Sequence, residues 1–270
     1  MGMPDPNNRK SKVVAVCGKG GVGKTSLSAA IVKLLTASHE NSVLAIDADP
    51  AVGLATSLDI KISKTVDDIR NDIIQRVQSG DTSSKAEMLN MLDYEMLSAV
   101  EERKNLAFLA IGRPEREGCY CQVNHILKDV IASIADNFDY VVIDGEAGIE
   151  QVNRRVMQRV THMILVSDVS AKGLNVVKTI KDVVDDAIEY EKIGLILNRL
   201  HSETERSQVC VPPELECIGW VPEDDTIRSF DIEGRSILEI PDCPAVHALR
   251  KCLSAVELLP SPQPGQAGNE

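Results

Sequence analysis

The stretch Gly18-Lys19-Gly20-Gly21-Val22-Gly23-Lys24-Thr25-Ser26 decides the fold of this chain. Its first eight residues match the pattern G-x-x-x-x-G-K-[ST], in which glycines let the backbone fold into a nest of N–H donors around phosphate oxygens. The apolar run Val13–Cys17 precedes the motif, and the amphipathic segment Thr25–Ala37 follows it. A buried strand, a phosphate-binding loop and the N-terminus of a helix are therefore predicted in succession, and a helix N-terminus itself favours anions.

The side chains of this loop have separate predicted roles. We expect Lys24 to reach the β- and γ-phosphates of a bound nucleotide and the Thr25 hydroxyl to bind Mg²⁺. The remaining residues of the loop, 18–23 and Ser26, are predicted to contact the nucleotide.

Strand-like and helix-like segments alternate along the rest of the chain. The further apolar runs are Val43–Ile46, Leu106–Ile111, Tyr140–Ile143, Met163–Val166, Ile193–Leu197 and Ile218–Val221. The helix-like segments between and after them are Thr65–Ile74, Val123–Ala135, Gly173–Tyr190 and Ala245–Leu258. Continuous apolar runs are typical of parallel strands that helices cover on both faces. The pattern predicts an α/β fold, a doubly wound, mostly parallel sheet of about seven to eight strands flanked by helices, as in P-loop NTPases.

The length of 270 residues suits one large domain. We expect a flexible N-terminus (residues 1–11), a single ATPase domain (12–258) with a helical insertion (61–104), and a disordered tail (259–270) rich in Pro, Gly, Gln and Ser.

The charge of the chain argues against two classes of partner. Lys and Arg number 29 against 41 Asp and Glu, a formal net charge of −12, which disfavours nucleic acid and anionic membranes. No apolar run is long enough to span a membrane, and residues 1–10 lack the apolar core of a secretory signal. We therefore expect a cytoplasmic protein whose seven cysteines are thiols rather than disulfides.

Acidic residues follow two of the predicted strands. Asp47 and Asp49 come after Val43–Ile46, and Asp144 comes after Val141–Ile143. Ligands of open α/β sheets bind at the carboxyl ends of the strands, so these carboxylates are predicted to lie beside the phosphate loop. A single strand-end Asp that caps the next helix is the common alternative.

The loop contains a second lysine, Lys19, within K-G-G-V-G-K-T. This sequence resembles the deviant Walker A motif of the SIMIBI group of NTPases, which includes MinD, ParA and the nitrogenase iron protein. The resemblance implies an ATPase that forms a homodimer, in which Lys19 touches the partner's nucleotide. It also implies that Asp47 or Asp49 orients the attacking water and that Asp144 contacts Mg²⁺. The residues alone allow a simpler role for Lys19, a second basic group near phosphate in its own subunit.

Two later segments suggest a pocket for the base. Asn198 and Arg199 follow a predicted strand, and Pro222 and Asp224 lie in the run Gly219–Asp224. Both segments resemble the adenine-binding loops of MinD-like proteins. The absence of an Asn-Lys-x-Asp motif favours ATP or ADP over guanine nucleotides. Asn at a strand end is also a common turn residue, which is the alternative here.

The pair Cys119 and Cys121 forms a C-x-C motif. On a helix the two thiols would point about 200° apart, but on a loop, which Pro114 and Gly118 favour, they can converge on one ion. Two thiolates do not complete a tetrahedral or square-planar site, so either other ligands join or two chains donate a pair each across a symmetric interface. Two ordinary loop thiols or a redox switch are the alternatives.

The segments 112–121 and 144–148 together resemble the CooC family, ATPases that assist nickel insertion into carbon monoxide dehydrogenase, with close relatives that serve acetyl-CoA synthase. The resemblance covers most of residues 12–255. It implies that Cys119 and Cys121 bind Ni²⁺ or Zn²⁺ at a dimer interface, and that nucleotide state controls dimerisation and metal release. Because hydrolysis would then drive a conformational switch rather than chemistry on a small substrate, we expect slow turnover without the client enzyme. It assigns no role to the insertion or to Cys210, Cys217, Cys243 and Cys252.

Two rival functions share the same nucleotide site. One is a ParA/MinD-like positioning switch, which the acidic balance disfavours. The other is an iron–sulfur electron-transfer ATPase like the nitrogenase iron protein, whose cysteines are well separated rather than arranged as C-x-C.

Overall fold

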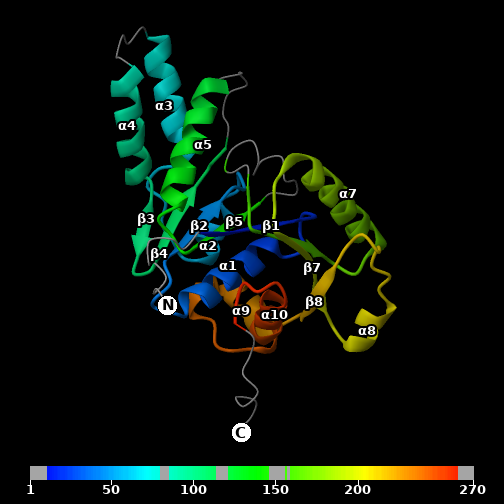
Figure 1. Cartoon of the computed structure of the whole chain (residues 1–270). Coiled ribbons are helices and arrows are strands. Elements are labelled where there is room, and N and C mark those ends of the chain that lie inside the picture. Colours follow the sequence, from blue (N-terminus) through cyan, green and yellow to red (C-terminus); the bar gives the residue numbers. More distant parts are fainter. Residues whose placement is uncertain (1–10, 80–84, 114–120, 146–155, 157–158, 261–270) are drawn as a thin grey trace, which may run out of the picture.

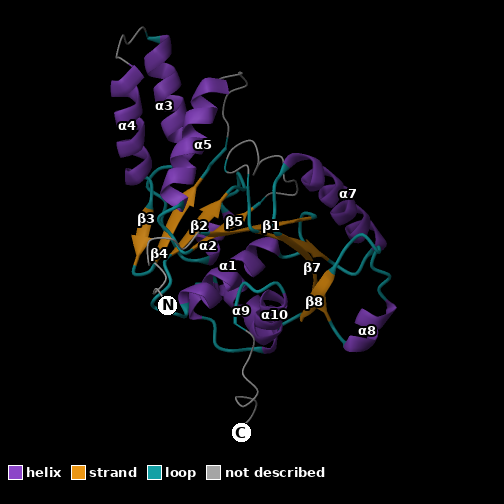
Figure 2. Ribbon diagram, in the orientation of Figure 1, coloured by secondary structure: helices purple, strands orange, loops and turns teal. Residues whose placement is uncertain are grey.

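The computed structural model describes residues 11–79, 85–113, 121–145, 156 and 159–260 (Figure 1). Within these ranges a central sheet is covered by helices on both faces (Figure 2). None of the helices in the described part combines the length and apolar character that a bilayer span requires. All but the last residue of the predicted flexible N-terminus (1–11) and most of the predicted tail (259–270) lie outside the described residues.

In the described part of the chain the sheet has eight strands, in the order β3-β4-β2-β5-β1-β6-β7-β8. All neighbours are parallel except β3 and β4, which are antiparallel. The strands are β1 (Lys12–Gly18), β2 (Val43–Asp47), β3 (Glu101–Arg103), β4 (Leu106–Ala110), β5 (Tyr140–Asp144), β6 (His162–Ser167), β7 (Lys192–Leu200) and β8 (Cys217–Pro222). The predicted doubly wound, mostly parallel sheet is confirmed. The short strand β3 was not predicted, because only three residues form it and none of them is apolar.

Successive residues of each strand enter different cores, because side chains alternate across a sheet. In β1, Val13, Ala15 and Cys17 belong to one apolar cluster, whereas Val14 and Val16 belong to the other. Both clusters consist mainly of Val, Ile, Leu and Ala, as the low aromatic content of the chain requires. Burial on both faces explains why the strands read as continuous apolar runs.

The helices divide between the two faces (Figure 1). One face carries α3 (Val66–Gln78), α4 (Lys85–Ser98), α5 (Cys121–Ala135) and α7 (Ala171–Ala187). The other carries α1 (Lys24–Thr36), α2 (Gly53–Ser57), α9 (Asp225–Glu233), α10 (Pro244–Ala255) and the short 3-10 helix η2 (Ile237–Glu239). Among the described residues, a further short helix is α8 (Glu203–Gln208), between β7 and β8.

The five predicted helices correspond to α1, α3, α5, α7 and α10, with ends that differ by a few residues. Residues 61–104 contain α3 and α4 and end in β3; α3 and α4 pack against α5 and project beyond the sheet (Figure 1). The sheet order places β1 at the centre, between β5 and β6. The phosphate loop therefore lies where the strand order reverses, with β5 and β2 on one side of β1 and β6 and β7 on the other. This is the usual ligand position in such folds.

Candidate functional site

The loop between β1 and α1 has the backbone that a phosphate nest requires. A Cβ atom at Gly18 would lie 2.1 Å from the carbonyl oxygen of Val166 on β6, so this position admits only glycine. Gly23, the N-cap of α1, has a φ of +88° and offers no side chain to the first amides of the helix. Those amides therefore remain available to an anion at the helix N-terminus.

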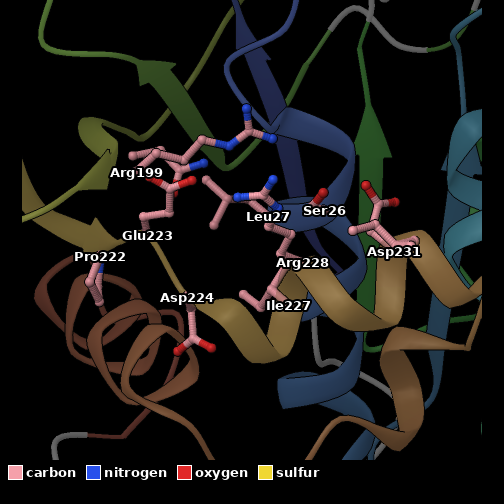
Figure 3. Close-up of a pocket in the computed structure, with 11 residues that line it drawn as sticks. Ser26, Leu27, Arg199, Pro222, Glu223, Asp224, Ile227, Arg228 and Asp231 are labelled. Atoms are coloured by element: carbon pink, nitrogen blue, oxygen red, sulfur yellow. The ribbon is translucent and has the colours of Figure 1, made fainter.

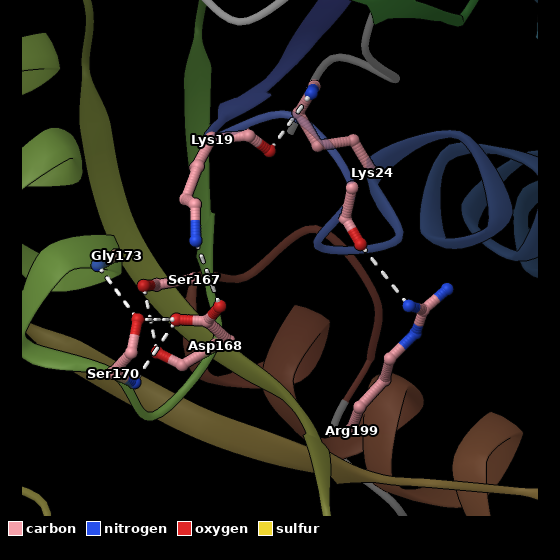
Figure 4. Close-up of polar contacts among 8 residues, drawn as sticks. Lys19, Lys24, Ser167, Asp168, Ser170, Gly173 and Arg199 are labelled. Atoms are coloured by element: carbon pink, nitrogen blue, oxygen red, sulfur yellow. Dashed lines mark hydrogen bonds and ion pairs between the residues drawn. The ribbon is translucent and has the colours of Figure 1, made fainter.

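Lys24 is the first residue of α1, and its side chain folds back over the loop. Its Nζ donates to the carbonyl oxygen of Lys19 at 3.3 Å (Figure 4), and only 8% of the residue is exposed. A nearly buried ammonium group close to the loop can bind phosphate without losing much further hydration.

Asp47 and Asp144 end neighbouring parallel strands, β2 and β5, and are direct register partners. Asp144 Oδ1 accepts the Ser28 hydroxyl at 2.9 Å, whereas its Oδ2 is buried and has no hydrogen-bond partner among the residues that the structure describes. Asp47 Oδ2 accepts the backbone N–H groups of Leu54 at 2.8 Å and Ala55 at 3.4 Å, at the start of α2. The two predicted carboxylates thus lie together, and no described group satisfies one of their oxygens.

Burial raises the pKa of Asp47 to about 7; the charge of Asp144 adds to the rise, and backbone amides oppose it. Burial also raises the pKa of Asp144, against the Thr25 and Ser28 hydroxyls and the charge of Lys24, which lower it. Two buried carboxylates beside a Thr hydroxyl form an oxygen-rich donor set, which suits a hard divalent cation. The residues present therefore fit Mg²⁺.

The pKa of Asp47 predicts a pH-dependent stability in the absence of nucleotide. Between pH ~4 and about 7 the folded protein keeps a proton on Asp47 that the unfolded chain has lost, so the free energy of unfolding falls as the pH rises through this range. Thermal unfolding midpoints of wild type and Asp47→Asn from pH 5 to 8.5 check this. The unfolding midpoint should fall more steeply with rising pH in wild type than in Asp47→Asn.

The difference between the two proteins isolates Asp47 from other titrating groups, such as His162, whose pKa burial lowers. Below pH ~7 a bound cation must displace the proton, so the extra stabilisation by Mg-ADP over ADP with EDTA should grow from pH 6 to pH 8. Parallel profiles for both proteins would contradict the prediction.

Asp49 shapes the turn after β2. Its Oδ1 accepts the N–H of Ala51 at 2.8 Å, and its own N–H donates to Asp47 Oδ1 at 3.1 Å. Asp47 and Asp49 are thus linked within one turn, and both lie on the carboxyl side of the sheet with the phosphate loop.

A pocket of about 480 Å³ lies beside the start of α1 (Figure 3). It brings together five residues predicted to contact nucleotide, Ser26, Asn198, Arg199, Pro222 and Asp224. Its other lining residues are Leu27, Glu223, Ile227, Arg228, Asp231 and Ile232. Four of these residues lie on α9 and were not predicted: Ile227, Arg228, Asp231 and Ile232. Their spacings of one, three and four residues would have placed them on one face of a helix.

Two of the predicted base-contacting residues also have structural partners. Asn198 Nδ2 donates to the carbonyl oxygen of Val22 at 2.8 Å, and the residue is only 7% exposed. Asp224 caps α9 by accepting the N–H of Thr226 and also accepts that of Ala245. Burial alone would raise the pKa of Asp224, but these hydrogen bonds outweigh it and lower the pKa below its usual value. Both side chains are therefore held in fixed orientations.

Lys19 contacts a residue that the sequence did not single out. Its Nζ lies 3.3 Å from Oδ2 of Asp168, just beyond β6 (Figure 4). The backbone N–H of Ser170 donates to Asp168 Oδ1 at 3.1 Å, and the Ser170 hydroxyl contacts the same oxygen. Desolvation would raise the pKa of Asp168, but these bonds and Lys19 lower it, so the carboxylate stays charged. Asp168 lies 149 positions from Lys19 in the chain, and no local motif links the two.

The predicted metal-binding pair lies only in part within the described residues. Cys119 falls outside them, and Cys121 is the first residue of α5. Among the residues that the structure describes, no three His, Cys, Asp or Glu side chains gather as metal ligands.

Comparison with known proteins gives four findings. The family described as AAA domain matches residues 11–195. An uncharacterised ATP-binding protein of Methanocaldococcus jannaschii is 34% identical over 233 residues, 85% of this chain and 92% of that protein. The carbon monoxide dehydrogenase accessory protein CooC of Rhodospirillum rubrum is 25% identical over 253 residues, 89% of this chain and 95% of that protein. The structure of the septum site-determining protein MinD of Pyrococcus horikoshii, complexed with Mg-ADP, matches with a TM-score of 0.62 at 21% identity, over 92% of this chain and 96% of that one. The last match confirms the predicted fold.

Proposed function

This chain belongs to the AAA domain family, and on that basis we propose that it is an ATPase that works as a dimerisation switch: it binds ATP with Mg²⁺, pairs with a second copy and is released by hydrolysis. The observation that carries the proposal is the buried Oδ2 of Asp144 beside Asp47, at the end of the sheet that also holds the phosphate loop; this oxygen has no hydrogen-bond partner in the described part of the chain. Such an oxygen is costly without a cation. The Mg-ADP in the MinD structure supports the choice of ligand.

Each residue of the site has a proposed role in hydrolysis. Thr25 and Asp144 would hold Mg²⁺, which supplies charge neutralisation on the phosphates. Lys24 would stabilise the β- and γ-phosphates, and residues 18–23 would present their amides to phosphate oxygens. Asp47 or Asp49 would orient the attacking water. Ser26, Asn198, Arg199, Pro222 and Asp224 would enclose the adenine and ribose.

Lys19 is proposed to act across the dimer on the partner's nucleotide. In the single chain its ammonium group pairs with Asp168, so the two contacts compete. Dimerisation with ATP would then require Lys19 to leave Asp168, and this exchange would lower the affinity of the subunits for each other.

Asp168→Asn should therefore promote the dimer. Both partners of this pair are about one-third exposed, 31% and 39%, which limits the gain. We expect the ATP concentration at half-maximal dimerisation to fall by up to about fivefold, the range of an exposed ion pair. Analytical ultracentrifugation against ATP measures it. Glu214→Gln, which breaks the exposed pair between Lys178 on α7 and Glu214 in the loop before β8, is the matched control and should leave the midpoint unchanged. An unchanged midpoint in Asp168→Asn would mean that Lys19 does not need to move.

At the finer level we propose that the switch serves maturation of a nickel enzyme. Cys119 and Cys121 of two subunits would hold one Ni²⁺ or Zn²⁺ ion as cargo at the dimer interface, and the client would be carbon monoxide dehydrogenase or acetyl-CoA synthase. The support is the similarity to the accessory protein CooC over 89% of the chain, together with the C-x-C motif. Four thiolates are a complete set for a soft or borderline ion, whereas two are not.

Anaerobic size-exclusion chromatography with metal analysis tests the finer proposal. Wild type and the double variant Cys119→Ala/Cys121→Ala would be loaded with Ni²⁺, with and without Mg-ADP. One tightly held ion per two chains, lost together with the metal-dependent dimer in the double variant, is the expected result. Metal-free protein that dimerises with ATP regardless of the cysteines would eliminate the cargo and leave the ATPase switch.

A ParA/MinD-like positioning switch is the second candidate, and the similarity in fold to MinD supports it. Co-sedimentation with DNA and with anionic liposomes, with ATP or ADP, separates the two functions. Salt-sensitive, ATP-dependent binding to either surface would favour the positioning switch. Visible absorption after anaerobic addition of iron and sulfide would instead favour an electron-transfer ATPase.

A further inference from the structure

The backbone of Arg199 is strained. Its φ of +62° lies in the left-handed region, which residues with a Cβ atom rarely adopt. The residue sits in an irregularity of the β7–β8 pairing, where Asn198 pairs with Val221 and Leu200 with Pro222. Glycine is the usual occupant of a left-handed bulge position, and bulges often redirect a side chain beside an active site. The presence of arginine rather than glycine at this position therefore requires a physical explanation.

The strained backbone aims the Arg199 side chain at the phosphate loop (Figure 4). One terminal guanidinium nitrogen donates to the carbonyl oxygen of Gly21 at 3.2 Å. The guanidinium also lies over Gly23, because a Cβ atom built there would be 3.4 Å from Nε. The preceding residue, Asn198, donates to the carbonyl oxygen of Val22 at 2.8 Å. Two consecutive residues of β7 thus hold two consecutive carbonyl groups of the loop.

A phosphate nest works only when its carbonyl groups point away from the anion. Successive N–H groups then converge on the phosphate, whereas a carbonyl oxygen turned inward would repel it. Donors on the outside of the loop, such as those of Asn198 and Arg199, stabilise this outward orientation. A charged donor does so more strongly than a neutral one.

We propose that Arg199 is a positioning residue for phosphate binding: by bonding the Gly21 carbonyl oxygen, it holds the loop in its nest conformation before nucleotide arrives. The inference rests on the proposed function and deepens it, because it assigns to Arg199 an effect on phosphate rather than on the base. Strain that persists at a functional site because it aims a side chain is a recognised arrangement.

The competing role for Arg199 is contact with the base, since the residue also lines the pocket. A ligand without a base separates the two roles. We would measure dissociation constants of Mg-ADP and Mg-tripolyphosphate by isothermal titration calorimetry for wild type, Arg199→Ala, Arg199→Gly and Arg199→Lys. Thermal unfolding midpoints without ligand would be recorded for the same proteins.

The control is Lys104→Gly. Lys104 also has a positive φ, +50°, but it lies exposed in the turn between β3 and β4. Glycine there relieves the same kind of strain away from the phosphate loop, so it should not lower the unfolding midpoint or change either dissociation constant.

Arg199→Ala and Arg199→Gly should both bind Mg-ADP and Mg-tripolyphosphate about tenfold more weakly than wild type, the effect expected for one charge-assisted hydrogen bond. The glycine variant should nevertheless unfold at a higher temperature than the alanine variant, because it relieves the strain. Arg199→Lys should recover part of the affinity for both ligands.

An unchanged affinity for Mg-tripolyphosphate with weaker Mg-ADP binding would overturn the inference and assign Arg199 to the base. The inference would also be overturned if the affinities correlated with the unfolding midpoints, so that Arg199→Gly bound both ligands more nearly like wild type than Arg199→Ala does. That result would assign Arg199 a purely structural role. If wild type binds neither ligand, the proposed function itself fails, and that result is distinct from the other two.

Discussion

Replacing Lys24 by alanine is expected to lower the rate of ATP hydrolysis at least a hundredfold. The loss of one charged group that stabilises developing negative charge has an effect of about this size in enclosed sites. Steady-state phosphate release at saturating Mg-ATP measures the effect, and Mg-ADP titration separates lost binding from lost chemistry.

The fold should tolerate this substitution. The Nζ of Lys24 bonds only the Lys19 carbonyl oxygen among described groups, and a nearly buried cation is removed. Lys33→Ala is the matched control, since Lys33 lies on the same helix and its Nζ donates instead to the carbonyl oxygen of Leu238. Lys33→Ala should retain turnover, and a Lys24→Ala protein that hydrolyses ATP at a comparable rate would contradict the assignment of the site.

The second large effect is expected from Asp144→Asn, which should change stability and cation binding in opposite directions. Burial disfavours the charged form of Asp144 and raises its pKa, so near pH 8 its replacement by the neutral isostere should stabilise the nucleotide-free protein. The amide oxygen can still accept the Ser28 hydroxyl, so the packing around the site is retained. The Mg²⁺ concentration for half-maximal activation of ATP binding should rise at least tenfold, because one charged ligand is lost.

Thermal unfolding without ligand and Mg²⁺ titrations at fixed ATP test the two parts separately. The substitution should also lower the pKa of Asp47, since the charge of Asp144 helps to raise it. The pH dependence of stability should then become shallower than in wild type. A variant that is both less stable and unchanged in its response to Mg²⁺ would show that Asp144 is a structural cap rather than part of a cation site. Asp139→Asn provides the comparison, because that carboxylate accepts hydrogen bonds from Ser42 at the opposite end of β5.

Local patterns in the sequence were sufficient to predict the overall fold of the molecule. The glycine-rich loop, the strand before it and the helix after it are contiguous, and their chemistry requires no distant partner. The apolar runs predicted seven of the eight strands, because burial on both faces of a parallel sheet imposes a composition that is readable residue by residue. Helix ends were less accurate, and α2, α8 and α9 were missed, because short helices carry too few turns for a clear period.

The electrostatics of the site could not be read from the sequence. The pKa of Asp47 depends on Asp144, which the order of strands places beside it although almost a hundred residues separate them. The same holds for the Lys19–Asp168 pair and for the bond from Arg199 to Gly21, which join positions 149 and 178 residues apart. Energies between charged and polar groups depend on distance and burial, and neither is encoded in local spacing.

The sequence by itself thus determined the fold class, the phosphate loop and which residue types stand at the strand ends, because each depends on neighbours within a few positions. Only the tertiary structure decided which of these residues meet. It placed Asp144 Oδ2 in a buried position without a partner among the described residues, gave Lys19 an ionic partner in its own chain, and directed Arg199 onto the phosphate loop through a strained bulge. The physical reason is that the winding of the sheet brings segments far apart in the chain within hydrogen-bonding distance at the carboxyl ends of its central strands.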